Sequence, residues 1–188
     1  MTAILSKPEA IDSPVRFGDH SVFIECVATQ NSGGMHGFWV NLELINSTDD
    51  WEAVTKFLFA TSNQPNAKEY KITDHQIPQF VSLADIPTMI RFVQISSSID
   101  SKQRDVYWSY CNHTNNVASS SEFEAAFQGV FNDEADFCYE QAKESGSNDG
   151  RYSDYIDWER VWKGEFNCNG YWAEDCFGGV AIFAGVGK

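Results

Sequence analysis

The segment from Asp133 to Glu144 restricts the possible folds strongly, because its residue types repeat with the period of an α-helix. The acids on one stripe of the helical wheel are Asp133, Asp136, Glu140 and Glu144. The opposite side carries Ala135, Cys138, Tyr139 and Ala142, as an amphipathic helix requires. We expect Asn132 to cap this helix at its N-terminus.

Four carboxylates on one stripe carry an electrostatic cost. Like charges at i,i+4 destabilise a helix by roughly 0.2–0.5 kcal/mol per pair. Asp133 and Glu134 are favourable in the first turn, where they complement the helix dipole, whereas Glu140 and Glu144 lie too near the other end. A solvated outer face is the simplest interpretation, and a surface that serves a binding partner is the alternative.

The composition is sufficient for a packed core, because 43% of the 188 residues are hydrophobic and 14% are aromatic. The formal net charge is −14. It is uneven, with −5 on residues 1–120 and −9 on residues 121–188. This balance argues against direct binding to nucleic acid or to anionic lipid. A partner with a basic surface is the natural complement.

The sequence indicates a cytoplasmic protein without a metal or another cofactor. No apolar run has the length of a membrane span, and the N-terminus lacks the apolar region of a signal peptide. The five cysteines contain no C-x-x-C pair and are expected to be reduced. Among the cysteines and histidines only Cys111 and His113 are close in sequence, which is too little for a zinc site.

The N-terminal part reads as a flexible leader followed by a small sheet and a helix. We expect strands over residues 22–28 and 37–44, joined by a turn at Asn31–Gly34, and a third strand over residues 69–73. Asp49 and Glu52 are predicted to cap the helix. The apolar face of that helix carries Trp51, Val54, Phe57 and Leu58.

The middle of the chain reads as short helices joined by polar loops. Residues 82–95 have helical character, with Pro87 as an interruption that splits or kinks the helix. Two further short helices are predicted over residues 106–111 and 122–127. The polar segment 115–121 separates them.

The C-terminal part adds a second helix and two strands to the acidic helix. The second helix starts near Asp157 and carries Trp158, Trp162 and Phe166 at i, i+4 and i+8. These rings belong either to the core or to a self-association face, because a small module buries three large rings with difficulty. Gly164 weakens this helix by roughly 1 kcal/mol. The predicted strands cover residues 170–173 and 180–183.

Catalytic motifs are weak. No G-x-S-x-G elbow frames a serine, and the glycines of residues 33–37 lack the P-loop lysine and fit a hairpin turn. The three acids Asp154, Asp157 and Glu159 contain a candidate acid/base pair of the kind that glycosidases use. A helix N-terminus accounts equally well for Asp157 and Glu159.

Five segments, in this order, resemble the ArdA family of antirestriction proteins. The first is VFIECVATQNSGGMHGFWVNLE, in which Asn31, Gly34, His36, Gly37 and Trp39 fit the opening strand, turn and second strand of the family. The others are EYKITDHQIPQF, AFQGVFNDEADFCYEQ, YIDWERVW and GGVAIF. The resemblance covers roughly residues 20–184. Each segment alone is weakly specific, but five in the right order are more so.

The resemblance implies an elongated, three-module, non-enzymatic protein of mobile genetic elements. Such proteins pair as homodimers through the C-terminal module. Their acidic surface mimics bent B-form DNA and occupies the DNA-binding groove of type I restriction-modification enzymes, on the methyltransferase core. A dimer at −28 has the charge of only about 48 Å of duplex, so the placement of charges has to matter more than their number.

The sequence departs from the family pattern at four positions. Asn41 and Val130 stand where acids are expected, and Lys68 and Lys71 flank Glu69 in a normally acidic segment. These departures reduce the expected mimicry, most of all in the first module.

We therefore expect an α+β chain with a leader (residues 1–19), an N-terminal α+β module (20–79), a helical module (80–125) and a C-terminal α+β dimerisation module (126–188). The expected phosphate mimics are Asp133, Asp136, Glu140, Glu144, Asp154, Asp157 and Glu159, with weaker candidates Asp49, Asp50, Glu52, Asp74 and Asp85. Two alternatives remain: an acidic adaptor for another basic DNA-binding protein, and a carboxylate-dependent hydrolase.

Overall fold

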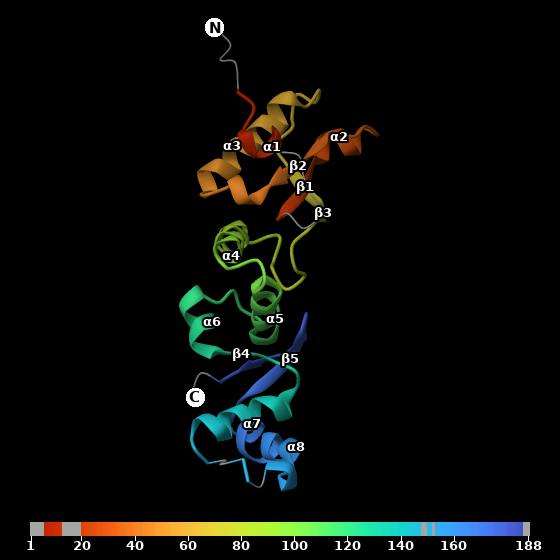
Figure 1. Cartoon of the computed structure of the whole chain (residues 1–188). Coiled ribbons are helices and arrows are strands. Elements are labelled where there is room, and N and C mark those ends of the chain that lie inside the picture. Colours follow the sequence, from red (N-terminus) through yellow and green to blue (C-terminus); the bar gives the residue numbers. More distant parts are fainter. Residues whose placement is uncertain (1–5, 13–19, 148–149, 152, 186–188) are drawn as a thin grey trace. The chain divides into compact units, whose positions relative to one another are not determined.

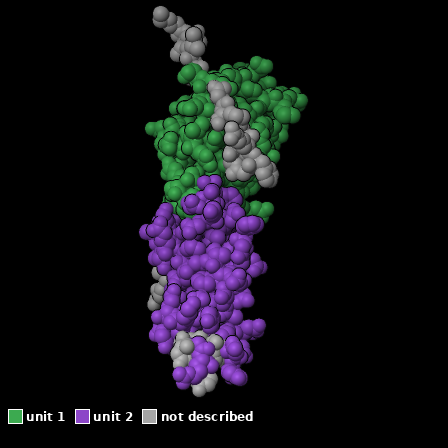
Figure 2. Space-filling view, viewed as in Figure 1, with its two compact units in different colours: residues 1–99 green, residues 100–188 purple. Residues whose placement is uncertain are grey.

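The fold combines helices with two small sheets. The computed structural model describes residues 6–12, 20–147, 150–151 and 153–185 (Figure 1). The chain divides into two compact units, residues 1–99 and 100–188 (Figure 2). Within the described residues, each unit contains helices and one three-stranded antiparallel sheet. The predicted α+β class is confirmed.

The boundaries of the predicted modules differ from those of the two units. The predicted helical module, residues 80–125, contributes α4 to the first unit and α5 and α6 to the second. The three-module organisation therefore stays a prediction. Of the predicted leader, residues 1–5 and 13–19 lie outside the described residues. Residues 9–12 form the helix α1, whose Ala10 is buried and which contacts β2.

The first unit is built on a sheet with β1 in the centre. Its elements are α1 (Glu9–Asp12), β1 (Ser21–Cys26), α2 (Val27–Asn31), β2 (Gly37–Asn41), the 3-10 helix η1 (Leu42–Leu44), α3 (Thr48–Thr61), β3 (Tyr70–His75) and α4 (Ile86–Ser98). The strand order is β2-β1-β3, and Phe23 lies opposite Trp39 across the hairpin. The predicted hairpin and third strand are thus confirmed, but the second strand, which was predicted to reach residue 44, ends at Asn41, where η1 begins. Val22, Ile24 and Cys26 alternate along β1 and are fully buried.

A buried histidine connects three segments of the first unit. His20 has no exposed surface, and its Nδ1 lies 2.9 Å from Glu43 Oε1 on η1. Its Nε2 lies 3.0 Å from the hydroxyl of Ser96, which is buried on α4. The His20 ring also contacts Phe92 edge-on, with the two centroids 6.0 Å apart. Since polar groups without water need partners, this network fixes α4 against the end of the sheet.

Three further local predictions in the first unit were wrong. The strand predicted over residues 22–28 ends at Cys26, and Val27 already begins α2. Helix α3 is capped by Ser47, whose Oγ accepts a hydrogen bond from the Asp50 N–H, and not by Asp49. Pro87 lies in the first turn of α4 and causes no kink, because the missing N–H of proline costs nothing at a helix start.

The second unit is a sheet with helices on both faces. Its elements are α5 (Arg104–Thr114), α6 (Ser120–Ala126), β4 (Phe127–Phe131), α7 (Glu134–Glu144), the 3-10 helix η2 (Ser153–Tyr155), α8 (Trp158–Val161), the π-helix η3 (Trp162–Phe166), the 3-10 helix η4 (Asn167–Asn169), β5 (Trp172–Cys176) and β6 (Gly179–Phe183). The strand order is β4-β6-β5. Phe183 of β6 contacts Tyr110 of α5, whereas its neighbour Ile182 packs beneath α7.

Strand β4 was missed, because residues 122–127 were predicted as helix throughout. Helix α6 ends at Ala126, and Phe127 begins the strand. The approach of β4 to β6 requires a glycine at position 179. This residue has φ +143°, and a Cβ there would lie 1.9 Å from the Phe131 carbonyl oxygen.

An aromatic cluster holds α7 to the rest of the second unit. Phe137 is 1% exposed and contacts Phe131, Trp162, Phe166 and Tyr171, with centroid distances from 4.9 to 6.1 Å. Ring pairs of this kind contribute stability beyond the burial of area. Trp162 is 6% exposed, and Trp158 and Phe166 are half-buried against the same cluster. All three predicted aromatic residues therefore contribute to the core of this unit.

We expect the Phe137→Ala variant to lower the free energy of unfolding by about 3–5 kcal/mol, because it leaves a cavity under α7. Phe137→Leu should cost less than about 1.5 kcal/mol, since it nearly conserves volume. Tyr155→Ala, at an aromatic side chain that is 87% exposed, should change little. Urea unfolding followed by tryptophan fluorescence measures all three. Equal losses for Phe137→Ala and Tyr155→Ala would contradict a core role for Phe137.

Candidate partner-binding surface

The acidic helix α7 starts with a network of its own acids. Asp133 is the N-cap, and its Oδ1 accepts a hydrogen bond from the Asp136 N–H at 2.8 Å. Asp136 Oδ2 accepts hydrogen bonds from the Asn132 N–H at 3.2 Å and from its side-chain amide at 2.8 Å. The predicted cap, Asn132, is thus one residue too early. Two acids of the stripe therefore stabilise the helix start in addition to presenting charge.

The second half of the stripe is weakly neutralised. Glu140 forms an ion pair with Lys143 at 3.3 Å, and the Glu140 side chain is 38% exposed. Glu144 is exposed and accepts a hydrogen bond from the Gln141 amide at 3.4 Å. Solvated ion pairs of this type contribute little to stability. From Asp133 to Glu144 the helix carries five acids against one lysine, so its surface stays strongly negative.

The core side of α7 differs from the predicted one by part of a turn. The buried residues are Phe137 and Cys138, and Phe137 lies between the stripe and the predicted apolar side. On the other flank, Tyr139 contacts Trp158 edge-on at 5.7 Å, which brings α7 and α8 together. The acids Asp136 and Glu140 are consequently half-buried along the flank of the helix.

A second group of acids surrounds the start of α8. Asp154 lies in η2 and is exposed. Asp157 is the N-cap of α8, and its Oδ1 accepts a hydrogen bond from the Arg160 N–H at 3.0 Å. Glu159 follows in the first turn and is exposed. Both Asp157 and Glu159 are placed where a helix dipole favours negative charge.

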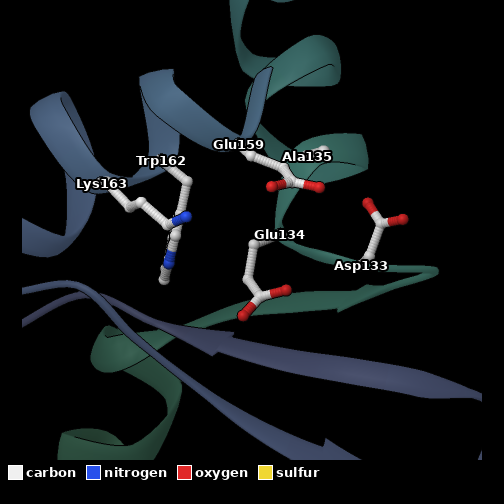
Figure 3. Close-up of a pocket in the computed structure, with 6 residues that line it drawn as sticks. All are labelled: Asp133, Glu134, Ala135, Glu159, Trp162 and Lys163. Carbon is white, nitrogen blue, oxygen red and sulfur yellow. The ribbon is translucent and has the colours of Figure 1, made fainter. Parts of the chain in front are cut away.

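Two hollows between α7 and α8 bring the two groups of acids together. One, of about 270 Å³, is lined by Asp133, Glu134, Ala135, Glu159, Trp162 and Lys163 (Figure 3). The other, of about 420 Å³, is lined by Ala135, Asp136, Tyr139, Asp154, Ile156 and Trp158. Of the predicted mimics of the C-terminal module, Asp133, Asp136, Asp154 and Glu159 therefore line these hollows, whereas Glu140, Glu144 and Asp157 line neither. We call the acids from Asp133 to Glu144 and from Asp154 to Glu159 the acidic ridge.

The weaker candidates belong to the first unit, where several have local structural roles. Asp50 accepts hydrogen bonds from the Asn46 N–H and the Ser47 hydroxyl, which hold the pKa of its carboxyl below the ordinary value. Glu52 pairs with Lys56 at 3.0 Å, and Asp85 caps α4. Asp49 is exposed in the first turn of α3, and Asp74 is exposed near the end of β3. These acids come from three elements.

The four departures from the family pattern lie in different environments. Asn41 is 9% exposed, and its side chain accepts a hydrogen bond from the Glu43 N–H, so it caps η1 instead of facing solvent. Val130 is 43% exposed on β4. Lys68 is exposed and Lys71 is half-buried on β3. The absence of an acid at position 41 therefore removes little negative charge from the surface.

Sequence reasoning missed two residues of the site. Glu134 was assigned only to the helix dipole, yet its side chain lines the smaller hollow. Lys163 enters the same hollow from η3. No pattern in the sequence predicts that Glu134 and Lys163 line the same hollow, because this depends on how α7 and α8 cross.

Neither a metal-binding cluster nor a membrane-spanning helix occurs in the described ranges. No group of three or more His, Cys, Asp or Glu side chains is arranged there to hold a metal ion. In the same part of the chain, no helix is both long and apolar enough to cross a membrane. All five cysteines are free thiols, as the sequence predicted.

A match to a family model shows which family the chain belongs to. The model of the antirestriction protein ArdA matches residues 22–175. The chain belongs to the ArdA family. No curated protein matches it. The ArdA match includes the whole acidic ridge and ends just before the exposed Phe177.

Burial of Cys138 on α7 perturbs the pKa of its thiol. Burial, and secondarily the charge of Glu134, raise the pKa of its thiol from an ordinary value of 9.0 to about 11. At pH 8 only about one Cys138 thiol in a thousand is then ionised, so iodoacetamide should modify exposed Cys168 first. The rate at Cys138 should rise with pH up to about 11. Glu134→Gln should lower this pKa, and an unchanged profile would contradict the assigned role of Glu134.

Proposed function

We propose that this ArdA-family chain inhibits type I restriction-modification enzymes by presenting carboxylates in place of DNA phosphates. The observation that carries the proposal is the acidic ridge. Its acids Asp133, Glu134, Asp136, Asp154 and Glu159 line two hollows between α7 and α8, and Lys163 is the one basic residue in the lining of the two. The family match gives the antirestriction activity, and the ridge supplies a physical basis for it.

The mimicry is sparser than DNA itself. Helix α7 has 11 residues, a length of about 16 Å, over which duplex DNA carries about ten phosphate charges. The segment from Asp133 to Glu144 has five acids and one lysine. Carboxylates three or four residues apart are about 5–6 Å apart, a spacing that cations lining a DNA groove can follow. Position therefore has to compensate for the lower number of charges.

Inhibition of this kind needs no covalent chemistry by the chain. The ridge competes for the Lys and Arg side chains with which the enzyme contacts phosphates, so binding should weaken steeply as salt rises. Asp157, the central residue of the candidate acid/base group, already accepts a backbone hydrogen bond as a helix cap. We therefore favour competitive binding over a hydrolase mechanism.

The direct test is displacement of DNA from a type I methyltransferase core at low salt. Asp136→Asn, Glu140→Gln and Glu144→Gln together remove three charges and keep an acceptor at position 136. We expect this triple variant to need about tenfold more protein for half-displacement, which corresponds to about 1.4 kcal/mol. Circular dichroism checks that α7 persists.

A matched control separates placement from total charge. Asp100→Asn, Glu124→Gln and Asp175→Asn together remove the same charge from exposed positions of the second unit that line neither hollow between α7 and α8. This control should displace DNA nearly as well as the unmodified chain. Equal weakening by both triple variants would show that only net charge matters. A pull-down that recovers a basic protein other than a restriction or methyltransferase subunit would favour the adaptor alternative.

The resemblance also implies a homodimer, and we propose the face with Val130 and Phe177 for it. These side chains are 43% and 101% exposed, and both line an open hollow of about 760 Å³ in the second unit. Exposed apolar groups of this size are typical of interfaces. The three predicted aromatic residues are instead largely engaged in the core of their own unit.

Sedimentation equilibrium tests the dimer face. Phe177→Ser with Val130→Ser should shift the chain to monomers at concentrations where the unmodified chain is dimeric. Tyr155→Ser, at another exposed aromatic side chain, is the matched control and should leave the dimer intact. A dimer that survives the first pair of substitutions and dissociates with the control would place the interface near η2.

A further inference from the structure

Two apolar side chains are exposed between acids of the acidic ridge. Tyr155 of η2 is 87% exposed, and Ile156, which follows it, is 36% exposed. In the sequence they stand between Asp154 and Asp157. Exposed apolar residues that stand singly are common on protein surfaces. An exposed tyrosine beside a second apolar residue, with charges at the rim, is instead typical of an interaction site.

A further hollow of the second unit begins at Ile156. It measures about 390 Å³, its surface is mostly apolar, and it is lined by Ile156, Asp157, Arg160, Val161, Gly164 and Glu165. We call it the apolar hollow. Ile156 also lines the hollow of about 420 Å³ that contains Asp136 and Asp154. The apolar hollow and part of the acidic ridge therefore meet at one side chain.

Gly164 keeps the apolar hollow open. A Cβ at this position would have no atom within 4 Å, so the position faces open space. Val161, one turn earlier, is half-buried and supplies part of the apolar wall. A volume of about 390 Å³ lies near the lower end of the range of ligand pockets, which suits a side chain better than a larger ligand.

The surrounding charges favour a basic partner over a second copy of the chain. Within the described lining, the acids Asp157 and Glu165 outnumber the base Arg160. A second copy seated on this hollow would bring the acids at positions 154, 157 and 159 of two chains together, and like charges across an interface repel. A basic partner neutralises the same acids.

DNA-binding enzymes carry apolar side chains of the kind that this hollow can take. Many proteins that bend the duplex insert Leu, Ile, Met or Phe between base steps. Others place apolar groups against the methyl group of thymine in the major groove. In both cases the apolar side chain reaches bases that are flanked by phosphates. Asp154 and Asp157 flank Tyr155 and Ile156 in the same order, with carboxylates in place of the phosphates.

We propose that Tyr155 and the apolar hollow receive an apolar side chain of the DNA-binding enzyme, one that contacts bases when DNA is bound. Basic neighbours of that side chain meet Asp154 and Asp157 at the rim. The contact adds a component to binding that salt does not screen, because burial of apolar surface involves no counterion release. The inference rests on the proposed function, since it names the group of the enzyme that this part of the chain contacts.

Filling the hollow is the direct test, measured as binding of the fluorescently labelled full chain to a type I methyltransferase core without DNA. Gly164→Leu should raise the dissociation constant at least fivefold, whereas Gly164→Ala, the matched control, should change it less than twofold. Because the Cβ of either variant meets no neighbouring atom, circular dichroism should show an unchanged fold. Equal dissociation constants for Gly164→Leu and the unmodified chain would overturn the proposal.

The salt dependence separates the apolar contact from the charge contacts. Tyr155→Ser with Ile156→Ser should raise the dissociation constant about tenfold at every salt concentration and leave the slope of its logarithm against log salt unchanged. The triple variant Asp136→Asn, Glu140→Gln and Glu144→Gln should instead lower that slope. A double variant that binds as tightly as the unmodified chain, or that alters only the slope, would overturn the apolar contact and leave DNA mimicry intact.

Two further measurements distinguish the occupants and the two proposals. Sedimentation equilibrium should find the same oligomeric state for the double variant and for the unmodified chain. A shift to monomers would assign the hollow to a second copy and overturn the contact with the enzyme. An unmodified chain that bound the methyltransferase core without displacing DNA would overturn the mimicry, and the Gly164→Leu result would still decide the apolar contact.

Discussion

The packing of Phe137 is the interaction on which the acidic surface depends. An isolated helix with this many acids on one side gains little from its own charges, because like charges repel along it. Phe137 inserts between β4 and the π-helix, in contact with Phe131, Trp162 and Phe166. The free energy gained by burying one aromatic ring is larger than the cost of several unfavourable pairs of like charges on the surface. Aromatic packing thereby holds charges in place that would otherwise disfavour the helix.

In the second unit, the two faces of the sheet are covered by helices of different character. On one face, Tyr110 and Phe123 pack against Phe183. On the other, α7 and α8 cover Ile182 and expose their acids. In the first unit, several acids are instead used for local structure, as with Asp50 at α3 and Asp85 at α4. The two units therefore contribute unequally to an anionic surface.

Much of the local structure could be predicted from the sequence, and the errors have physical causes. Period and turn signals located α3, α7 and the β1–β2 hairpin within a few residues. The cap of α7 was misplaced because Asn132 and Asp133 are equally good cap residues. Strand β4 was missed although F-Q-G-V-F alternates, because the preceding helix runs directly into it. The hollow that joins Glu134 and Glu159 follows from a helix crossing that no local pattern encodes.

The double use of Asp133 and Asp136 has an evolutionary consequence. Asparagine caps helices as well as aspartate does, and its amide oxygen accepts the same hydrogen bonds. Exchanges between the two residue types at these positions can therefore change the negative potential one charge at a time while the fold persists. Under the proposed function, such exchanges grade the affinity for the partner in single-charge steps without loss of the helix start.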